Sequence, residues 1–409
     1  MKSFSFFTLI AAASAVYADP PQPAFRAVEI DTKIQIGYGV AVADVDGDKL
    51  PDILLADKKQ FVWYKNPGPR SDPGTWQKFV IAENLTAKDN VCLAAQDIDG
   101  DGKCEIAVGA QWDPGDTENS GAVFYLIPPA DRTQRWEPVK LHAEPTTHRM
   151  RWIRIGEGKW GLVVVPLHGR GNKNGEGAGV RVLLYLPPPS LNDPKGEWKT
   201  ELIDEKMHMT HNFEIVPDRG DGTAAPTILL AGREGVASLR RTPDGTWKRI
   251  LDDLAGASGP PSPGVGEVRL CDVRVGGKGT FASVEPMHGN QLVFSRADPS
   301  TVPPRMVRTL LTDKLLEGHA LACGDLLGIG SDQVIVGWRG NPAKPDVKVG
   351  IALWAPLDVE QGNWRESPID DNTMACEDLR LADLNGDGKL DIVAAGRATK
   401  NVKVYFNQR

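Results

Sequence analysis

Three short loops in the sequence place acidic side chains at alternate positions of a tight turn. The first loop has the form D-x-D-G-D-x-x-x-D, and the other two keep this frame with Glu as the last acid or Asn as the second ligand. Oxygens at alternate positions of a turning loop converge on one point, where a hard cation relieves their mutual repulsion. We expect that cation to be Ca²⁺. The expected ligands are Asp44, Asp46, Asp48 and Asp52; Asp97, Asp99, Asp101 and Glu105; and Asp383, Asn385, Asp387 and Asp391.

An EF-hand is a rival interpretation of these loops, but it requires flanking helices and a Glu at the twelfth position, and the sequence has neither. Solvated turns without metal remain an alternative, most of all in the first loop, where Lys49 replaces the usual glycine. We expect a bound cation to stiffen the loops and to have no part in chemistry.

Each acidic loop joins two apolar runs, which predicts two antiparallel strands connected by the loop. Taking the first acid of each loop as an anchor, weaker copies of the pattern have anchors at Arg154, Pro217, Asp272 and Asp325. The seven anchors recur every 53 to 63 residues, close to the length of a four-stranded propeller blade. The sequence therefore predicts an all-β fold, a seven-bladed β-propeller of four-stranded blades.

The rest of each repeat supplies a third strand and a fourth strand that usually begins with a packing tryptophan. The last repeat ends without a fourth strand, and residues 25–30 (FRAVEI), which precede the first repeat, resemble one. We expect this segment to pair with the last blade and close the ring, which removes an open sheet edge. The predicted blades are 38–82, 90–142, 148–204, 211–252, 266–312, 319–370, and 377–409 with 25–30, within a single domain, 19–409.

Alignment of the repeats shows two positions rich in histidine and arginine. Six residues before the anchor stand Tyr38, Val91, His148, His211, Gly266, His319 and Glu377. At the end of the second strand stand Lys58, Gln111, His168, Arg233, His288, Arg339 and Arg397. Strand direction puts both positions at one end of the ring and the acidic turns at the other. His142 and His208 lie outside both positions, and we expect no role for them.

Imidazoles and guanidiniums gathered at one mouth fit recognition of an anionic or keto sugar, in which arginines neutralise a carboxylate or enolate and a histidine removes a proton. A second divalent metal, held by two or three histidines with Glu377, is an alternative source of positive charge. Structural, hydrogen-bonded histidines are the rival interpretation. The candidate catalytic residues are His168, His211, His288, His148, His319, Arg233 and Arg339.

Composition and the N-terminus bear on compartment and partners. The sequence has five cysteines and a formal net charge of −7. A small and odd number of cysteines implies neither a disulfide framework nor a zinc cluster. We expect the cysteines to be small, buried residues of strands. The acidic balance argues against nucleic acid. Residues 1–18 are typical of a signal peptide, and no later segment has enough consecutive apolar residues to span a membrane, so we expect a secreted or periplasmic protein. We expect this protein to be a monomer and to bind carbohydrate.

The acidic loops resemble FG-GAP/VCBS repeats, which implies a propeller. The segments EPMHGNQ (285–291), PLHGRGN (166–172) and MHMTHNF (207–213) are similar to the propeller domain of aldos-2-ulose dehydratase and, more distantly, to propeller-fold polysaccharide lyases. This resemblance implies dehydration or lyase chemistry, with His168, His211 and His288 as the first catalytic or metal candidates. Cupin domains, which follow the propeller in that dehydratase, are not part of this sequence, so an isomerase step is not implied.

We therefore expect a carbohydrate-active lyase or dehydratase that acts on keto or uronic sugars by proton abstraction and β-elimination. The alternative is a non-catalytic glycan- or protein-binding propeller, because the fold alone does not define an activity.

Overall fold

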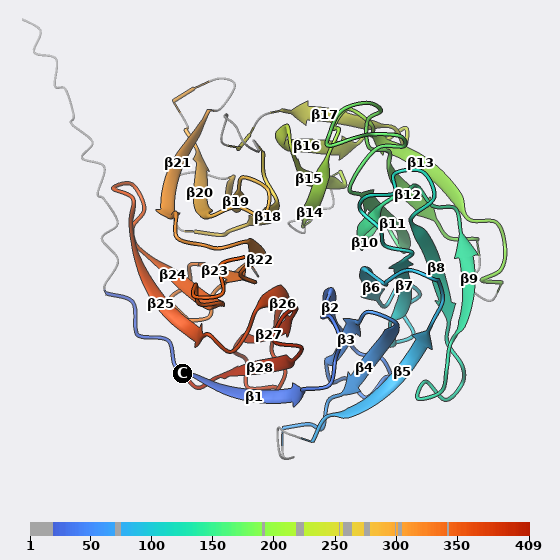
Figure 1. Cartoon of the computed structure of the whole chain (residues 1–409), viewed down its shortest axis with the longest axis horizontal. Helices are drawn as coiled ribbons and strands as arrows, with labels where there is room; N and C mark the ends of the chain where they lie inside the picture. The colour runs from blue at the N-terminus through green and yellow to red at the C-terminus, as the bar shows by residue number, and fades with distance from the viewer. Residues whose placement is uncertain are drawn as a thin grey trace, which may run out of the picture.

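Seven four-stranded antiparallel sheets form a ring in the computed structural model (Figure 1). The structure describes residues 19–69, 75–189, 193–217, 225–252, 254–256, 264–273, 279–298, 300–301, 305–341 and 343–409. The predicted all-β seven-bladed propeller is confirmed. The predicted signal peptide, 1–18, lies outside the described residues. Among the described residues, no helix has the length and apolar character needed to span a membrane.

The first three blades follow one another along the chain, each with its first strand innermost. Blade 1 consists of β2 (Gly39–Ala43), β3 (Asp52–Ala56), β4 (Gln60–Lys65) and β5 (Gln77–Glu83). Blade 2 consists of β6 (Cys92–Gln96), β7 (Glu105–Ala110), β8 (Ala122–Ile127) and β9 (Glu137–Leu141). Blade 3 consists of β10 (Thr147–Gly156), β11 (Lys159–Pro166), β12 (Val182–Leu186) and β13 (Lys199–Asp204).

The next three blades repeat this order. Blade 4 consists of β14 (Thr210–Val216), β15 (Thr227–Gly232), β16 (Gly235–Arg241) and β17 (Trp247–Leu251). Blade 5 consists of β18 (Glu267–Leu270), β19 (Thr280–Glu285), β20 (Gln291–Ala297) and β21 (Met306–Thr312). Blade 6 consists of β22 (Gly318–Gly324), β23 (Gln333–Trp338), β24 (Gly350–Asp358) and β25 (Asn363–Asp371).

Blade 7 joins the two ends of the described chain. It consists of β26 (Cys376–Ala382), β27 (Asp391–Gly396), β28 (Val402–Asn407) and, as its outer strand, β1 (Phe25–Asp31). The antiparallel register runs from Phe25 opposite Asn407 to Val28 opposite Val404. Figure 1 shows this closure as the blue strand β1 beside the red strand β28. The predicted closing strand is therefore confirmed, and it removes a free sheet edge.

The hydrophobic core lies between neighbouring blades. Trp63 of blade 1 and Phe124 of blade 2 belong to one buried cluster, and Tyr64 of blade 1 packs in another with Val404 of blade 7. The tryptophan that opens the fourth strand belongs to these clusters as well, and Trp136 is only 3% exposed. Because each blade buries its two faces against two neighbours, the ring holds the innermost strands in fixed mutual positions.

One expectation from the cysteine count is wrong. Cys271, directly after β18, and Cys323 of β22 form a disulfide. The two residues stand one and two positions before the anchors Asp272 and Asp325, so adjacent innermost strands bring them together. Repeat alignment places them side by side, whereas an odd count conceals the pair. Cys92, Cys104 and Cys376 are free and buried, as expected.

Candidate functional site

Bulges at the start of four innermost strands turn one side chain of each toward the axis of the ring. The strand pairing skips one residue in blades 3, 6 and 7, where His148, His319 and Glu377 are the extra residues. In blade 4 the same shift falls between Thr210 and Phe213, which includes His211. A bulge leaves one residue out of the ladder and re-aims its side chain, so the first histidine position is defined by backbone geometry.

Each histidine at this position is held by the next blade around the ring. The Nδ1 atom of His148 lies 2.9 Å from the carbonyl oxygen of His211, and the Nδ1 atom of His211 lies 3.0 Å from that of Gly266. The Nδ1 atom of His319 lies 2.6 Å from the carbonyl oxygen of Glu377. A carbonyl oxygen only accepts, so Nδ1 donates in all three and Nε2 of the neutral ring keeps its lone pair.

Blade 5 supplies its histidine differently. Gly266 occupies the first position, and a Cβ atom there would lie 3.2 Å from the backbone nitrogen of His288 and 3.8 Å from Nδ1 of His211. The absent side chain therefore leaves room for the tight turn between β19 and β20, where His288 has a left-handed φ of 48°. His288 enters the space that a residue at the Gly266 position would otherwise fill.

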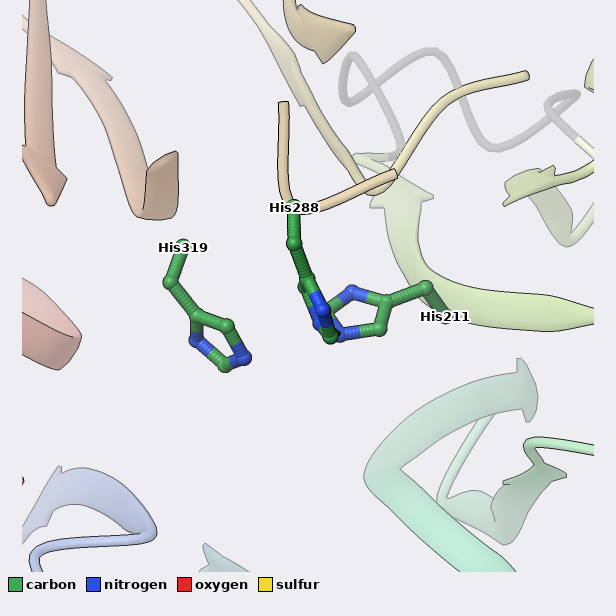
Figure 2. A group of neighbouring side chains, drawn as sticks. All are labelled: His211, His288 and His319. Carbon is green, nitrogen blue, oxygen red and sulfur yellow. Dashed lines mark hydrogen bonds between the residues drawn. The ribbon is translucent and has the colours of Figure 1, made fainter. Parts of the chain in front are cut away.

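Four imidazoles come together from four blades. Ring centroids are 4.7 Å apart for His148 and His211, 4.5 Å for His211 and His288, and 4.9 Å for His288 and His319. The Nε2 atoms of His211 and His288 are 2.6 Å apart. One ring nitrogen each from His211, His288 and His319 lies within 4.8 Å of the others, and Figure 2 shows these rings facing a common space. We call these three residues the histidine triad.

Burial keeps the imidazoles neutral. Burial first, and then the charge of the neighbouring Arg149 on His148 and of Arg339 on His319, hold the pKa of both rings well below the usual value. Burial and the neighbouring His211 do the same to the pKa of His288. Burial also lowers the pKa of His211, although Glu267 opposes this shift. Neutral imidazoles are the form that binds a metal, so the triad fits a divalent cation with nitrogen ligands.

Arginines and one glutamate lie beside the triad. Both carboxylate oxygens of Glu377 accept hydrogen bonds from Nη1 of Arg339, at 3.0 and 3.1 Å, and Arg397 donates to the same carboxylate. The Nη2 atom of Arg339 lies 3.5 Å from Nδ1 of His288. The Oε1 atom of Glu377 is 3.8 Å from Nε2 of His319. The mouth thus carries fixed positive charge next to neutral imidazoles.

Two of the expected residues do not join this cluster. Among the described residues, no ring contact links His168 to the other four histidines, and its backbone is tied to Thr146. Arg233 donates to the backbone oxygen of Asn174. Both contacts involve the long connection between β11 and β12, residues 167–181, which contains His168 and Asn174. His168 still lies at the same mouth, where it forms a β-bridge with Met209, and within the described part of the chain its buried Nδ1 has no hydrogen-bond partner.

Two residues of the cluster were missed from the sequence. Nη1 of Arg149 lies 2.9 Å from Nε2 of His148, so His148 is not free to bind a metal through that atom. Glu267 is 1% exposed, and its Oε1 is 3.2 Å from Nδ1 of His211. Burial alone would raise the pKa of Glu267, but the adjacent His211 and Arg269 lower it to about 2. Both residues follow the first histidine position by one, and the alignment of the repeats contains this signal.

The acidic loops lie at the opposite ends of the innermost strands. One carboxylate oxygen each from Asp44, Asp46 and Asp48 lies within 4.8 Å of the others, and the same holds for Asp97, Asp99 and Asp101. The fourth acid of each loop points inward to the backbone instead: the carboxylates of Asp52, Glu105 and Asp391 accept hydrogen bonds from Val45, Ile98 and Leu384. In the first loop, the ammonium of Lys65 contacts both Asp46 and Asp48. A lysine there competes with a cation.

Fold and repeats together define a seven-bladed β-propeller with FG-GAP-like repeats. Residues 37–108 match the model of the FG-GAP-like repeat, and residues 120–296 match that of the aldos-2-ulose dehydratase β-propeller domain. The resemblances to FG-GAP repeats and to the propeller domain of aldos-2-ulose dehydratase are therefore confirmed. The histidines from His148 to His288 lie inside the second matched segment.

Other comparisons bear on the fold alone. None of the curated protein sequences compared with this chain matches it. Among solved structures, the chain is similar to the crystal structure of BBS1N in complex with ARL6DN, soaked with mercury. The TM-score is 0.54 at 12% identity, and the match covers 95% of this chain and 98% of that one. Such a likeness supports the propeller and carries no information about activity.

Proposed function

We propose that the protein is a carbohydrate-active dehydratase or lyase that acts on keto or uronic sugars by proton abstraction and β-elimination at the histidine mouth. The observation that carries the proposal is the convergence of three neutral imidazoles, from blades 4, 5 and 6, beside Arg339. The similarity of residues 120–296 to a dehydratase propeller supports the same class of chemistry.

The triad is the site proposed for a divalent cation. His211 and His319 each donate Nδ1–H to a backbone oxygen, which orients the ring and leaves Nε2 as the donor atom. The contact of 2.6 Å between the Nε2 atoms of His211 and His288 requires a shared proton, which a cation would replace. A cation bound there would supply Lewis-acid polarisation of a substrate carbonyl.

The remaining steps are assigned to residues of this chain. His168 is the imidazole at this mouth outside the cluster, and burial lowers its pKa, so the neutral ring is able to accept the proton α to the carbonyl. Arg339, held by Glu377 and Glu317, places positive charge where an enolate or a sugar carboxylate develops. As the enolate collapses, the bond to the β-oxygen breaks and the protonated His168 returns its proton to that oxygen, so that a hydroxyl leaves as water and a glycosidic oxygen leaves as the alcohol of the released sugar.

The experiment supplies the purified protein with an anhydro-keto sugar and with an oligogalacturonate and follows ultraviolet absorbance of an unsaturated product. The His168→Ala variant is expected to lose the reaction and keep its metal content, whereas His211→Ala loses both. His142→Ala, in an exposed residue outside the cluster, is the matched control. If no sugar is converted and His168→Ala binds a glycan as well as the parent, the protein is the non-catalytic binding propeller and the catalytic proposal is wrong.

Calcium in the acidic loops is a separate proposal. The three acids of the second loop present oxygens without a lysine contact among the described residues, and in the third loop the one ion pair that these acids make within the described chain is the long contact of 3.6 Å between Lys389 and Asp387. Gly102 and Gly388 adopt the left-handed conformation at the turn. In the first loop, Lys49 takes that conformation and Lys65 contacts the acids. We assign Ca²⁺ to the second and third loops, with weaker binding in the first.

A further inference from the structure

A second polar ring lies three residues further along the innermost strands than the first histidine position, about 10 Å away at the rise of a β-strand. Blades 3, 5 and 7 place Arg151, Arg269 and Arg380 at this position, and blade 4 places Glu214 there. The corresponding residues of the other three blades are alanines, namely Ala41, Ala94 and Ala322. Charge is thus gathered at one level of the ring, and small residues leave space beside it.

These charged residues line a half-open cavity. Arg151, Arg269, Arg380 and Glu214 line a space of about 260 Å³. Leucines from β18, β22 and β26 complete its wall, and Cys323 of the disulfide borders it. Three guanidiniums from three separate blades therefore face one hollow, which lies on the side of the histidine cluster toward the acidic turns.

The guanidiniums in this cavity are not fully paired. The Nη2 atom of Arg269 is buried and makes no hydrogen bond among the described residues, although it lies 3.3 Å from Glu267. Arg269 as a whole is 7% exposed. The nearest approach of Glu214 to Arg269 is 3.8 Å, beyond hydrogen-bond distance. A buried cationic donor without a hydrogen-bond acceptor is costly, and an anion in the cavity would supply one.

The other two arginines use neutral or shared acceptors. Arg151 donates to the backbone oxygen of Phe213 and to the side-chain oxygen of Asn212, neither of which carries charge. Arg380 donates to Asp378 at 2.7 Å, but this carboxylate also accepts from the backbone of Val40 and Leu379. Burial first, and then the charges of Arg269 and Arg380, lower the pKa of Arg151 to about 9. Burial is the largest cause of this pKa shift, and repulsion from the other two guanidiniums adds to it.

We propose that this cavity is a second ligand site, distinct from the histidine mouth, that takes a small oxyanion: a sulfate, a phosphate or the carboxylate of a sugar acid. Guanidinium forks match the oxygens of such groups, and a hollow below the size of typical drug-sized pockets suits an ion or a single sugar unit. The proposal rests on the arginine ring alone, and it stands or falls independently of the chemistry at the histidines.

The test uses the full protein and isothermal titration calorimetry with sodium sulfate, sodium phosphate and sodium glucuronate, with sodium chloride at matched ionic strength and glucose as uncharged references. Saturable binding of at least one oxyanion is expected, with none for glucose. Arg151→Gln and Arg380→Gln are each expected to weaken it at least about tenfold. Arg154→Gln removes the same charge from an exposed residue of the same strand and is expected to leave it unchanged.

The probes separate the two sources of the anion. Tighter binding of glucuronate than of sulfate identifies a sugar carboxylate as the ligand, and the reverse order identifies a free inorganic ion. The thermal midpoint of each variant without added anion shows whether its fold is intact, and Arg151→Lys, which keeps the charge and loses the fork, is expected to bind with intermediate affinity. Equal loss in Arg154→Gln, or no saturable binding by any of the three oxyanions, overturns the proposal.

Discussion

Blades 1 and 2 differ from blades 3 to 6 at both ends of the innermost strand of each blade. Blades 1 and 2 keep complete acidic loops and carry Tyr38 and Val91 at the first histidine position. Blades 3 to 6 have lost the acidic pattern, and three of them carry a histidine there while blade 5 inserts His288. The FG-GAP-like match, 37–108, covers blade 1 and the first half of blade 2, and the match to the dehydratase propeller, 120–296, runs from the second half of blade 2 into blade 5.

From this difference we infer that the loop at one end of a repeat changes independently of the side chain at the other end. The blades fix the mutual positions of the innermost strands through the cores between them, so a loop at one end is free to change without moving a side chain at the other. Blade 7 combines the two types, because it keeps the third acidic loop and carries Glu377 at the mouth.

The largest expected effect tests whether this division is functional. His319→Ala in blade 6 is expected to lower the rate of sugar elimination by about 10²–10⁴-fold and to remove the bound metal, because it deletes one triad nitrogen. Tyr38→Phe at the equivalent position of blade 1 is expected to change the rate by no more than about twofold. Initial rates and metal content measured together check both, and a comparable loss in the two variants would show that the blades do not differ in function.

A second prediction concerns how blades 5 and 6 are stabilised. Their disulfide joins positions directly before two degenerate loops, where no complete acidic set remains. Cys271→Ser with Cys323→Ser is expected to lower the free energy of unfolding by about 2–4 kcal/mol. Denaturant unfolding with and without a reducing agent measures this. Reductant is expected to destabilise the parent and not the double variant, and equal sensitivity of both would contradict the assignment.

How much of the structure is predictable from the sequence depends on whether a feature repeats from blade to blade. Repeat spacing predicted the ring and the closing strand because each blade repeats one hydrophobic pattern. The first histidine position was predictable because His148, His211 and His319 share one register. Arg149 and Glu267 were missed because their importance depends on which side chain each one contacts, namely the preceding His148 for Arg149 and His211 of the neighbouring blade for Glu267. His168 and Arg233 were grouped with the cluster by register, but the connection after β11 is longer than in other blades, and register does not encode loop length.

The third prediction compares the acidic loops with one another. Added Ca²⁺ is expected to raise the thermal midpoint, with a gain of roughly 2.7 kcal/mol per loop when the ion is about 100-fold above its dissociation constant. Asp97→Asn with Asp99→Asn is expected to remove most of the gain from the second loop. Asp44→Asn with Asp46→Asn in the first loop is expected to remove much less, because Lys65 already pairs with Asp46 and Asp48 of that loop. Differential scanning calorimetry with Ca²⁺ and with chelator separates the cases, and equal losses would contradict the proposed order.

The smallest expected effect concerns Lys65 and the affinity of the first acidic loop for Ca²⁺. Lys65→Ala removes the ammonium from the first loop, where it lies 2.8 Å from Asp48. The ion pair is partly exposed, so its removal without calcium is expected to cost no more than about 1 kcal/mol. With calcium present, the acids regain their full charge toward a cation, and we expect the first loop to bind Ca²⁺ more tightly than in the parent. Lys59→Ala, in the same blade and paired with Asp89, is the matched control. An unchanged Ca²⁺ affinity in Lys65→Ala would mean that Lys49, whose φ of 70° stands where the other loops have glycine, limits the site.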